Sequence, residues 1–99
     1  MTQAYVIANV LFTDPAKAQQ YGHQIAEVIG RYGGHYLARG GQTEVAEGDW
    51  KTHYVTIVEF ASVEQAKRWY ESPEYAAIKP LRVENSESQI VFVEGVAAS

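Results

Sequence analysis

The sequence contains no cysteine. This absence excludes disulfide bonds, thiolate nucleophiles, iron–sulfur clusters and zinc sites built on cysteine. Small secreted domains usually depend on such cross-links, so we expect this chain of 99 residues to be cytoplasmic. The length fits a single domain over residues 1–99, with its core at about residues 4–96.

Basic residues are also few, since 8 Lys and Arg stand against 12 Asp and Glu and give a net charge of −4. A chain of this charge has no electrostatic support for binding nucleic acid or an anionic membrane surface, and we expect neither partner. No long hydrophobic run is present: the N-terminal apolar stretch is too short to span a bilayer and lacks the features of a signal peptide.

The sequence patterns of cofactor and metal sites are missing as well. There is no phosphate-binding loop, dinucleotide fingerprint or nucleophile elbow. The three histidines, His23, His35 and His53, show no metal-ligand spacing, and His23 lies off the apolar stripe of its helix, where it would be a poor haem ligand. We therefore predict neither a metal nor a cofactor.

What is present is an alternation of strand and helix patterns separated by turn residues. Apolar and β-branched runs predict strands, and apolar positions three and four apart predict helices. Strands are expected over residues 4–12, 35–39, about 52–60 and 89–94, and helices over about 15–32, from 62 onward and, as a short third helix, from 73. Residues 43–47 could extend the second strand, residues 47–49 predict a hairpin turn and residues 83–88 a polar crossover.

Capping residues fix the ends of these predicted helices. Asp14, Ser62 and Ser72 each stand where a side-chain oxygen can accept from the free N–H groups of a first turn. Gly33 can adopt the left-handed conformation that closes a helix. Pro80 is expected to end or kink the third helix.

The resulting β-α-β-β-α-β order predicts an α+β fold of ferredoxin-like design. Such a fold has a four-stranded antiparallel sheet with its helices on one face. The strands are nevertheless apolar on both faces, and a monomer with an uncovered apolar sheet is not expected in water. We therefore expect a homodimer in which two sheets pack face to face and form a closed or nearly closed barrel.

Several short fragments, in order and over roughly residues 4–96, resemble the bacterial domain-of-unknown-function family 1330. They are Thr13-Asp14-Pro15, Tyr32-Gly33-Gly34, Arg39-Gly40-Gly41, Glu47-Gly48-Asp49-Trp50, Val58-Glu59-Phe60, Trp69-Tyr70-x-Ser72-Pro73-Glu74-Tyr75, Arg82 and Glu94-Gly95. The resemblance implies the dimeric α+β barrel superfamily, which also holds muconolactone isomerases, small cofactor-free monooxygenases and haem-degrading enzymes. A function taken from that superfamily is an analogy of fold alone.

Arg39 is the first candidate for binding a ligand. It ends a predicted strand beside Gly40 and Gly41, where a guanidinium could hold a carboxylate or another anion. The alternative is a β-bulge in which Arg39 pairs with Glu59 on the neighbouring strand. A Glu59 left unpaired in an apolar cavity could instead act as a base.

The predicted catalytic set is His35, His53 and Glu59. Strand alternation places His35 on one face with Leu37 and Arg39, and His53 on one face with Glu59. If both faces line the barrel, these groups converge on one cavity and could remove a proton next to a carbonyl and hold the oxyanion. Alternatively, the histidines are packing residues that touch solvent at strand ends.

Three further residues are predicted to contact a ligand. Trp50 lies on the predicted turn, Tyr75 at the start of the short capped helix, and Asn9 inside an apolar strand. The alternatives are a hairpin anchor for Trp50, helix-to-sheet packing for Tyr75 and a hydrogen bond to neighbouring backbone for Asn9.

These observations predict a cofactor-free enzyme that acts on a small carbonyl or aromatic compound inside a barrel cavity. The alternatives are a noncatalytic module that binds a small ligand, and a structural dimer whose cavity is filled by its own side chains.

Overall fold

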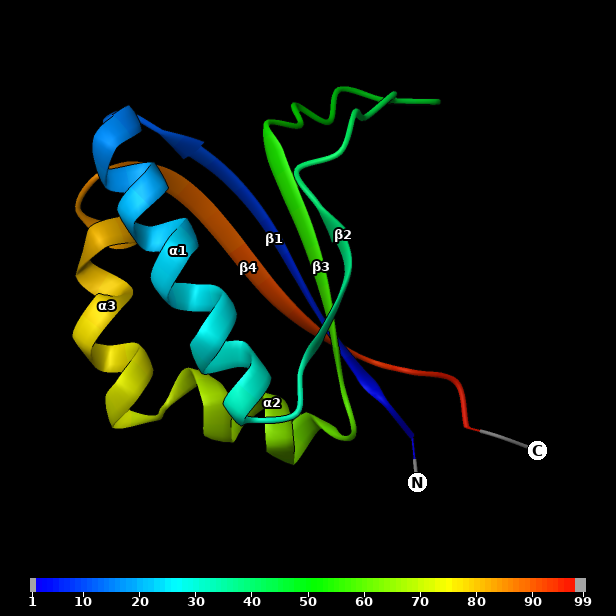
Figure 1. The fold of residues 1–99 in the computed structure, drawn as a ribbon. Helices are drawn as coiled ribbons and strands as arrows, with labels where there is room; N and C mark the ends of the chain where they lie inside the picture. The colour runs from blue at the N-terminus through cyan, green and yellow to red at the C-terminus, as the bar shows by residue number, and fades with distance from the viewer. Residues whose placement is uncertain (1, 98–99) are drawn as a thin grey trace.

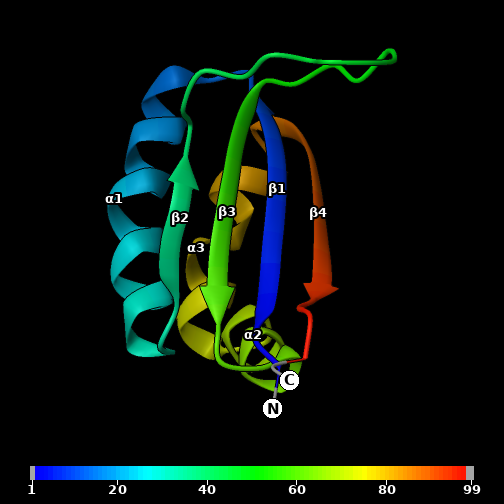
Figure 2. The same ribbon diagram turned by 90° about the vertical axis from the view of Figure 1, so that its right-hand side faces the viewer.

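The computed structural model describes residues 2–97 and confirms the ferredoxin-like α+β fold (Figure 1). The elements are β1 (Ala4–Phe12), α1 (Pro15–Arg31), β2 (His35–Arg39), β3 (Tyr54–Phe60), α2 (Val63–Tyr70), α3 (Pro73–Val83) and β4 (Ser86–Glu94). The strands form one antiparallel sheet in the order β2-β3-β1-β4. Figure 2 shows that all the helices lie behind one face of this sheet, so the other face is left open.

The predicted caps are the reason the helices begin where they do. The Asp14 side chain accepts from the amides of residues 16 and 17 at 3.0 and 3.2 Å. Ser62 accepts from the amide of residue 65 at 3.1 Å, and Ser72 from that of residue 75 at 3.0 Å. After α1, Gly33 has a φ of 79°, and the next amide bonds back to the carbonyl of Ile29 at 2.9 Å.

The core lies between the helices and the inner face of the sheet. Phe60 on β3 and Trp69 on α2 stack with ring centroids 5.6 Å apart, and Tyr75 on α3 packs 4.7 Å from Trp69. The side chains of Val6 and Ile29 join them from β1 and α1. Burial of these large apolar groups is the main stabilising term of the fold.

The segment between β2 and β3 differs from the prediction. Residues 43–47 form no strand; instead residues 40–53 form an irregular arm that extends away from the sheet and folds back on itself (Figures 1 and 2). The predicted turn lies at its bend, where Gly48 has a φ of 88°, and the hydroxyls of Thr43 and Thr52 lie 2.6 Å apart across the arm. Every residue of this arm except Thr52 is exposed. Its glycines and charges give no alternating apolar face of the kind that lets a strand join the sheet.

The end of α3 also differs from the prediction. The helix continues through Pro80 to Val83, and β4 begins at Ser86 rather than at residue 89. Proline removes one backbone hydrogen bond, but Pro80 lies on the exposed side of the helix. The buried side chains of Ile78 and Arg82 on either side of it hold this turn against the body of the protein.

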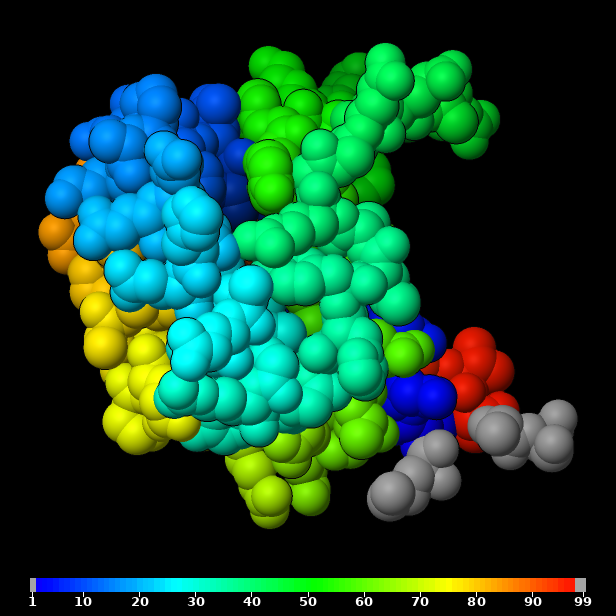
Figure 3. Space-filling view, viewed as in Figure 1, coloured from blue at the N-terminus to red at the C-terminus, as the bar shows by residue number. Residues whose placement is uncertain are grey.

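The open face of the sheet is largely apolar. Ile7 lies opposite Ile57 on β3 and Val91 on β4, and Leu37 on β2 is 56% exposed. In Figure 3 this side of the molecule is hollowed between the arm and the segment after β4. We call it the outer face below. None of the helices within residues 2–97 combines the length and the hydropathy needed for a bilayer span.

Candidate functional site

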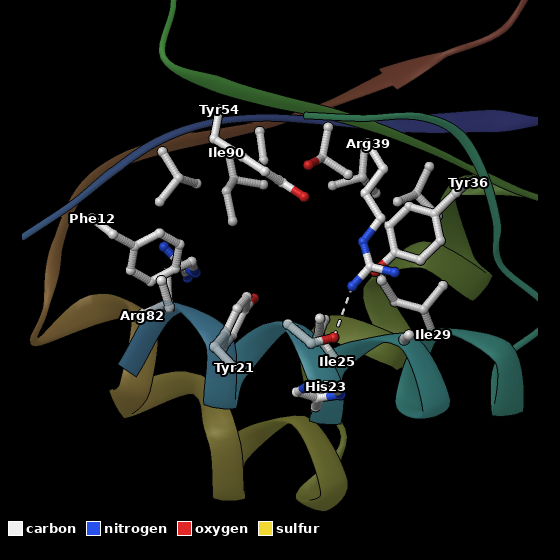
Figure 4. Close-up of a pocket in the computed structure, with 18 of the residues that line it drawn as sticks. Phe12, Tyr21, His23, Ile25, Ile29, Tyr36, Arg39, Tyr54, Arg82 and Ile90 are labelled. Carbon is white, nitrogen blue, oxygen red and sulfur yellow. Dashed lines mark hydrogen bonds between the residues drawn. The ribbon is translucent and has the colours of Figure 1, made fainter. Parts of the chain in front are cut away.

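A cavity of about 570 Å³ lies between α1 and the inner face of the sheet (Figure 4). Its walls are mainly apolar, and six of the side chains that form them are Val6, Val10, Ile25, Ile29, Val58 and Ile90. Inner-face residues of β1 alternate with outer-face residues, so the same strand supplies one wall of the cavity and part of the open face.

The polar side chains of the cavity lining are arginines and tyrosines together with Gln19, His23 and Thr56. Its lining includes two arginines, Arg39 and Arg82, and three tyrosines, Tyr21, Tyr36 and Tyr54, but no aspartate or glutamate. This differs from the whole chain, in which acidic residues outnumber basic ones 12 to 8. The cavity therefore presents cations and hydroxyl donors and favours a ligand with negative charge on oxygen.

Arg39 lies at the mouth of the cavity. Its Nη2 donates to the carbonyl of Gly22 on α1 at 2.8 Å, and its guanidinium lies 4.6 Å from the centre of the Tyr36 ring. Gly40 follows with a φ of 66°, and a Cβ there would collide with the ring of Tyr54. Glycine at residue 40 is therefore what allows Tyr54 to sit beside Arg39 at the mouth.

Arg82 lies at the end of the cavity opposite Arg39, and the residue is only 5% exposed. Its Nε donates to the Tyr75 hydroxyl at 3.2 Å and its Nη1 to Ser88 at 2.6 Å. Within residues 2–97 the only ion pair joins Arg31 and Glu27, so this buried guanidinium has no carboxylate beside it. Buried cations usually have one.

The Tyr21 hydroxyl near Arg82 stays protonated. The hydroxyls of Tyr75 and Tyr21 are 2.8 Å apart. Burial, reinforced by Tyr75, raises the pKa of Tyr21 far above its ordinary value. Burial opposes the charge of Arg82, but contacts with Tyr75 and Tyr21 raise the pKa of Arg82 overall, so it remains a cation. The group thus offers hydrogen-bond donors rather than a base.

The predicted grouping of Arg39 with His35, His53 and Glu59 is wrong for Arg39, whereas His35 and Glu59 do share one face of the sheet. A bulge between residues 36 and 38 breaks the alternation of β2, so Arg39 turns to the inner face while His35 lies opposite Glu59 on the outer one. Arg39 lines the cavity, but His35, His53 and Glu59 do not, and Arg39 makes no pair with Glu59. His53 lies at the base of the arm.

The other predicted ligand contacts also lie outside the cavity lining. Asn9 is on the outer side of β1, where its amide donates to the carbonyl of Lys51 at 2.9 Å and accepts from the amide of His53 at 2.8 Å. Asn9 thus holds the base of the arm through hydrogen bonds to backbone, as its alternative interpretation predicts. Trp50 is on the arm and 59% exposed, whereas Tyr75 is fully buried in the core.

Sequence reasoning missed Arg82 and Tyr21 as site residues, although a signal for Arg82 exists. Arg82 follows Tyr75 by seven positions and Ile78 by four, so it occupies the buried stripe of α3. A cation in an apolar stripe is an exception that needs a reason. Tyr21 also fits the apolar stripe of α1, and only the structure brings its hydroxyl to Tyr75.

Comparisons with solved structures show the same architecture. A protein of unknown function from Rhodopseudomonas palustris is 17% identical with a TM-score of 0.75, over 98% of this chain and 85% of that one. SnoaB, a cofactor-independent oxygenase from Streptomyces nogalater, is 15% identical with a TM-score of 0.70, over 99% and 97%. A dimeric ferredoxin-like protein of unknown function from Thermobifida fusca is 8% identical with a TM-score of 0.63, over 94% and 91%.

These identities establish a shared fold and not a shared activity. No curated protein matches the chain. Residues 3–96, nearly the whole sequence, match the domain of unknown function DUF1330. The chain therefore belongs to the DUF1330 family.

Proposed function

We propose that the cavity binds a small carbonyl or aromatic compound and that the protein acts on it as a cofactor-free enzyme. The observation that carries this proposal is the cavity of about 570 Å³, with mainly apolar walls and a polar lining that includes two arginines and three tyrosines but no carboxylate. Small-molecule sites commonly measure about 300–1,000 Å³ and combine apolar walls with a few polar groups.

The chemistry that such a lining supports is the stabilisation of negative charge on oxygen. Cations and hydroxyl donors in a largely apolar cavity favour the enolate of a bound carbonyl compound, or the phenolate of a phenol, over the neutral form. The released proton passes to water at the mouth, where Arg39 and Tyr54 are exposed. The enolate can then be reprotonated or react with dioxygen, and the fold shared with SnoaB supports this class of reaction.

Arg39 is assigned the role of orienting the ligand at the mouth. Its guanidinium is exposed and bridges the end of β2 to Gly22 on α1, so an entering ligand meets it first. His35, His53 and Glu59 receive no role in the cavity, because none of them lines it.

We also propose that a second copy of the chain covers the outer face. The supporting observations are the uncovered apolar side chains of Ile7, Ile57 and Val91, and the overhanging arm beside them. The dimeric relative from Thermobifida fusca supports the same assembly. Two such faces packed together would remove the apolar surface that a monomer leaves in water.

The enzymatic proposal is tested with 1-tetralone in D₂O, with no cofactor added. We expect catalysed exchange of the hydrogens next to the carbonyl by NMR, or oxygen consumption at an oxygen electrode. Arg39→Ala should abolish ligand binding while the protein stays folded by circular dichroism. If wild-type protein causes neither exchange nor oxygen consumption, the enzymatic proposal fails for this substrate class.

A paired substitution on α1 tests whether the cavity is the binding site. Ala18 lines the cavity and Ala16, on the same helix, is exposed and does not. Ala18→Phe should fill part of the cavity and weaken ligand binding about tenfold or more, whereas Ala16→Phe should change it less than about twofold. Isothermal titration calorimetry measures both. Equal binding by the two variants would place the ligand elsewhere.

A noncatalytic ligand-binding module is the second candidate. One observation favours it: no carboxylate lines the cavity to accept a proton. For this candidate, 1-tetralone would bind with no exchange above the rate in buffer.

A further inference from the structure

We propose that the natural ligand of the cavity carries an acidic oxygen, as a carboxylate or as an enol or phenol, and that Arg82 and Tyr21 bind this oxygen at the inner end. This inference rests on the proposed function, because it names the substrate class for the same cavity. The inference also goes beyond the proposed function, because it assigns the orientation of the ligand in the cavity.

The first argument is the charge left without a partner. Arg82 is buried, yet its two hydrogen bonds go to the hydroxyls of Tyr75 and Ser88 and neither goes to a carboxylate. Within residues 2–97 no hydrogen bond from its Nη2 is found and no carboxylate lies within ion-pair distance. A buried guanidinium is costly unless an anion compensates it, and an anionic ligand in the cavity would do so.

The second argument is the order of donors. The Arg82 Nε–H can only donate, and it donates to the Tyr75 oxygen. Tyr75 can then give its own proton to Tyr21, 2.8 Å away, which leaves the proton of Tyr21 free for a ligand. Tyr21 lines the cavity whereas Tyr75 does not, and Figure 4 shows the Tyr21 hydroxyl directed into it.

The third argument decides between the two arginines. Figure 4 shows Arg82 beside Phe12 at one end and Arg39 at the other. Arg39 is exposed and its Nη2 already donates to the carbonyl of Gly22, so solvent screens its charge. At the same separation, attraction is roughly fourfold stronger at an effective dielectric of about 20 than in water at about 80, which favours the buried Arg82. The acidic oxygen therefore lies inward and the rest of the ligand extends toward the mouth.

The test uses three probes that share one ring system: 2-naphthoate, 2-naphthol and 2-naphthamide. Binding is measured by fluorescence titration at pH 7 with wild-type protein, Arg82→Met and Tyr21→Phe. Arg68→Met is the matched control, because Arg68 is exposed on α2 and does not line the cavity. Circular dichroism verifies that each variant is folded.

We expect an acidic probe to bind wild type about 10- to 100-fold more tightly than the amide. Preference for naphthoate identifies a carboxylate ligand, and binding of naphthol with the absorption band of naphtholate identifies a phenol or enol. Arg82→Met and Tyr21→Phe should each lose most of this preference for the acidic probe, and the control Arg68→Met should keep it. Tyr21→Phe, which retains the ring, decides the matter if Arg82→Met fails to fold.

Two outcomes overturn the inference and can be told apart. If all three probes bind equally well, or if Tyr21→Phe retains the full preference, the assignment of the acidic oxygen is wrong while the cavity remains a binding site. If none of the probes binds, the inference and the proposed binding of aromatic compounds fall together.

Discussion

Replacing Ile57 with lysine is expected to convert the protein to a monomer at micromolar concentration. Ile57 lies near the middle of the outer face, opposite Ile7 on β1 and Ala38 on β2. In a face-to-face dimer the new ammonium group would be buried without a partner. Central interface substitutions of this kind cost about 2–4 kcal/mol, which weakens association roughly 30- to 700-fold.

Sedimentation equilibrium over a dilution series measures this effect. Gln24→Lys introduces the same charge on the exposed side of α1 and should leave the dimer intact. A wild-type protein that sediments as a well-ordered monomer would remove the dimer proposal. An Ile57→Lys variant that associates as tightly as wild type would place the interface on another surface.

Replacing Tyr75 with alanine is expected to cause a severe loss of stability. Its ring is fully buried, 4.7 Å from that of Trp69 and 5.5 Å from that of Tyr70. Truncating a buried aromatic residue costs about 3–5 kcal/mol, a large part of the roughly 5–15 kcal/mol that holds a domain folded. Tyr75→Phe should cost about 1–3 kcal/mol, since the Nε of Arg82 then loses its acceptor.

Urea denaturation at a fixed protein concentration measures both changes, because association also contributes to stability. Val83→Ala, at a half-exposed position of the same helix, should change the unfolding free energy by no more than about 0.5 kcal/mol. A loss below about 1 kcal/mol for Tyr75→Ala would contradict the central packing role assigned to this ring.

The arm shows how far local patterns carry a prediction of the fold. The caps at Asp14, Ser62 and Ser72 were predicted correctly because each depends on a side chain and an amide only a few residues apart. The path of residues 40–53 depends instead on contacts with distant parts of the chain, such as the hydrogen bonds from Asn9 on β1 that hold its base. Composition alone cannot reveal that.

The candidate site shows the same limit on a smaller scale. Arg39 was correctly placed next to a glycine-dependent turn, but its companions were assigned by strict alternation along β2. One extra residue at the bulge reverses that alternation, so the predicted partner His35 ends on the opposite face. The actual inner group joins Tyr21, Tyr75 and Arg82, which lie on two helices far apart in sequence.

The sequence by itself determined the ferredoxin-like order of elements, the ends of most of them and the presence of apolar residues on both faces of the sheet. These follow from interactions between neighbours along the chain and from side-chain periodicity. Only the tertiary structure decided which face holds the cavity, which cation lies unpaired inside it and which residues meet there. Those outcomes depend on a single-residue change of strand register and on contacts between distant helices, which no local pattern encodes.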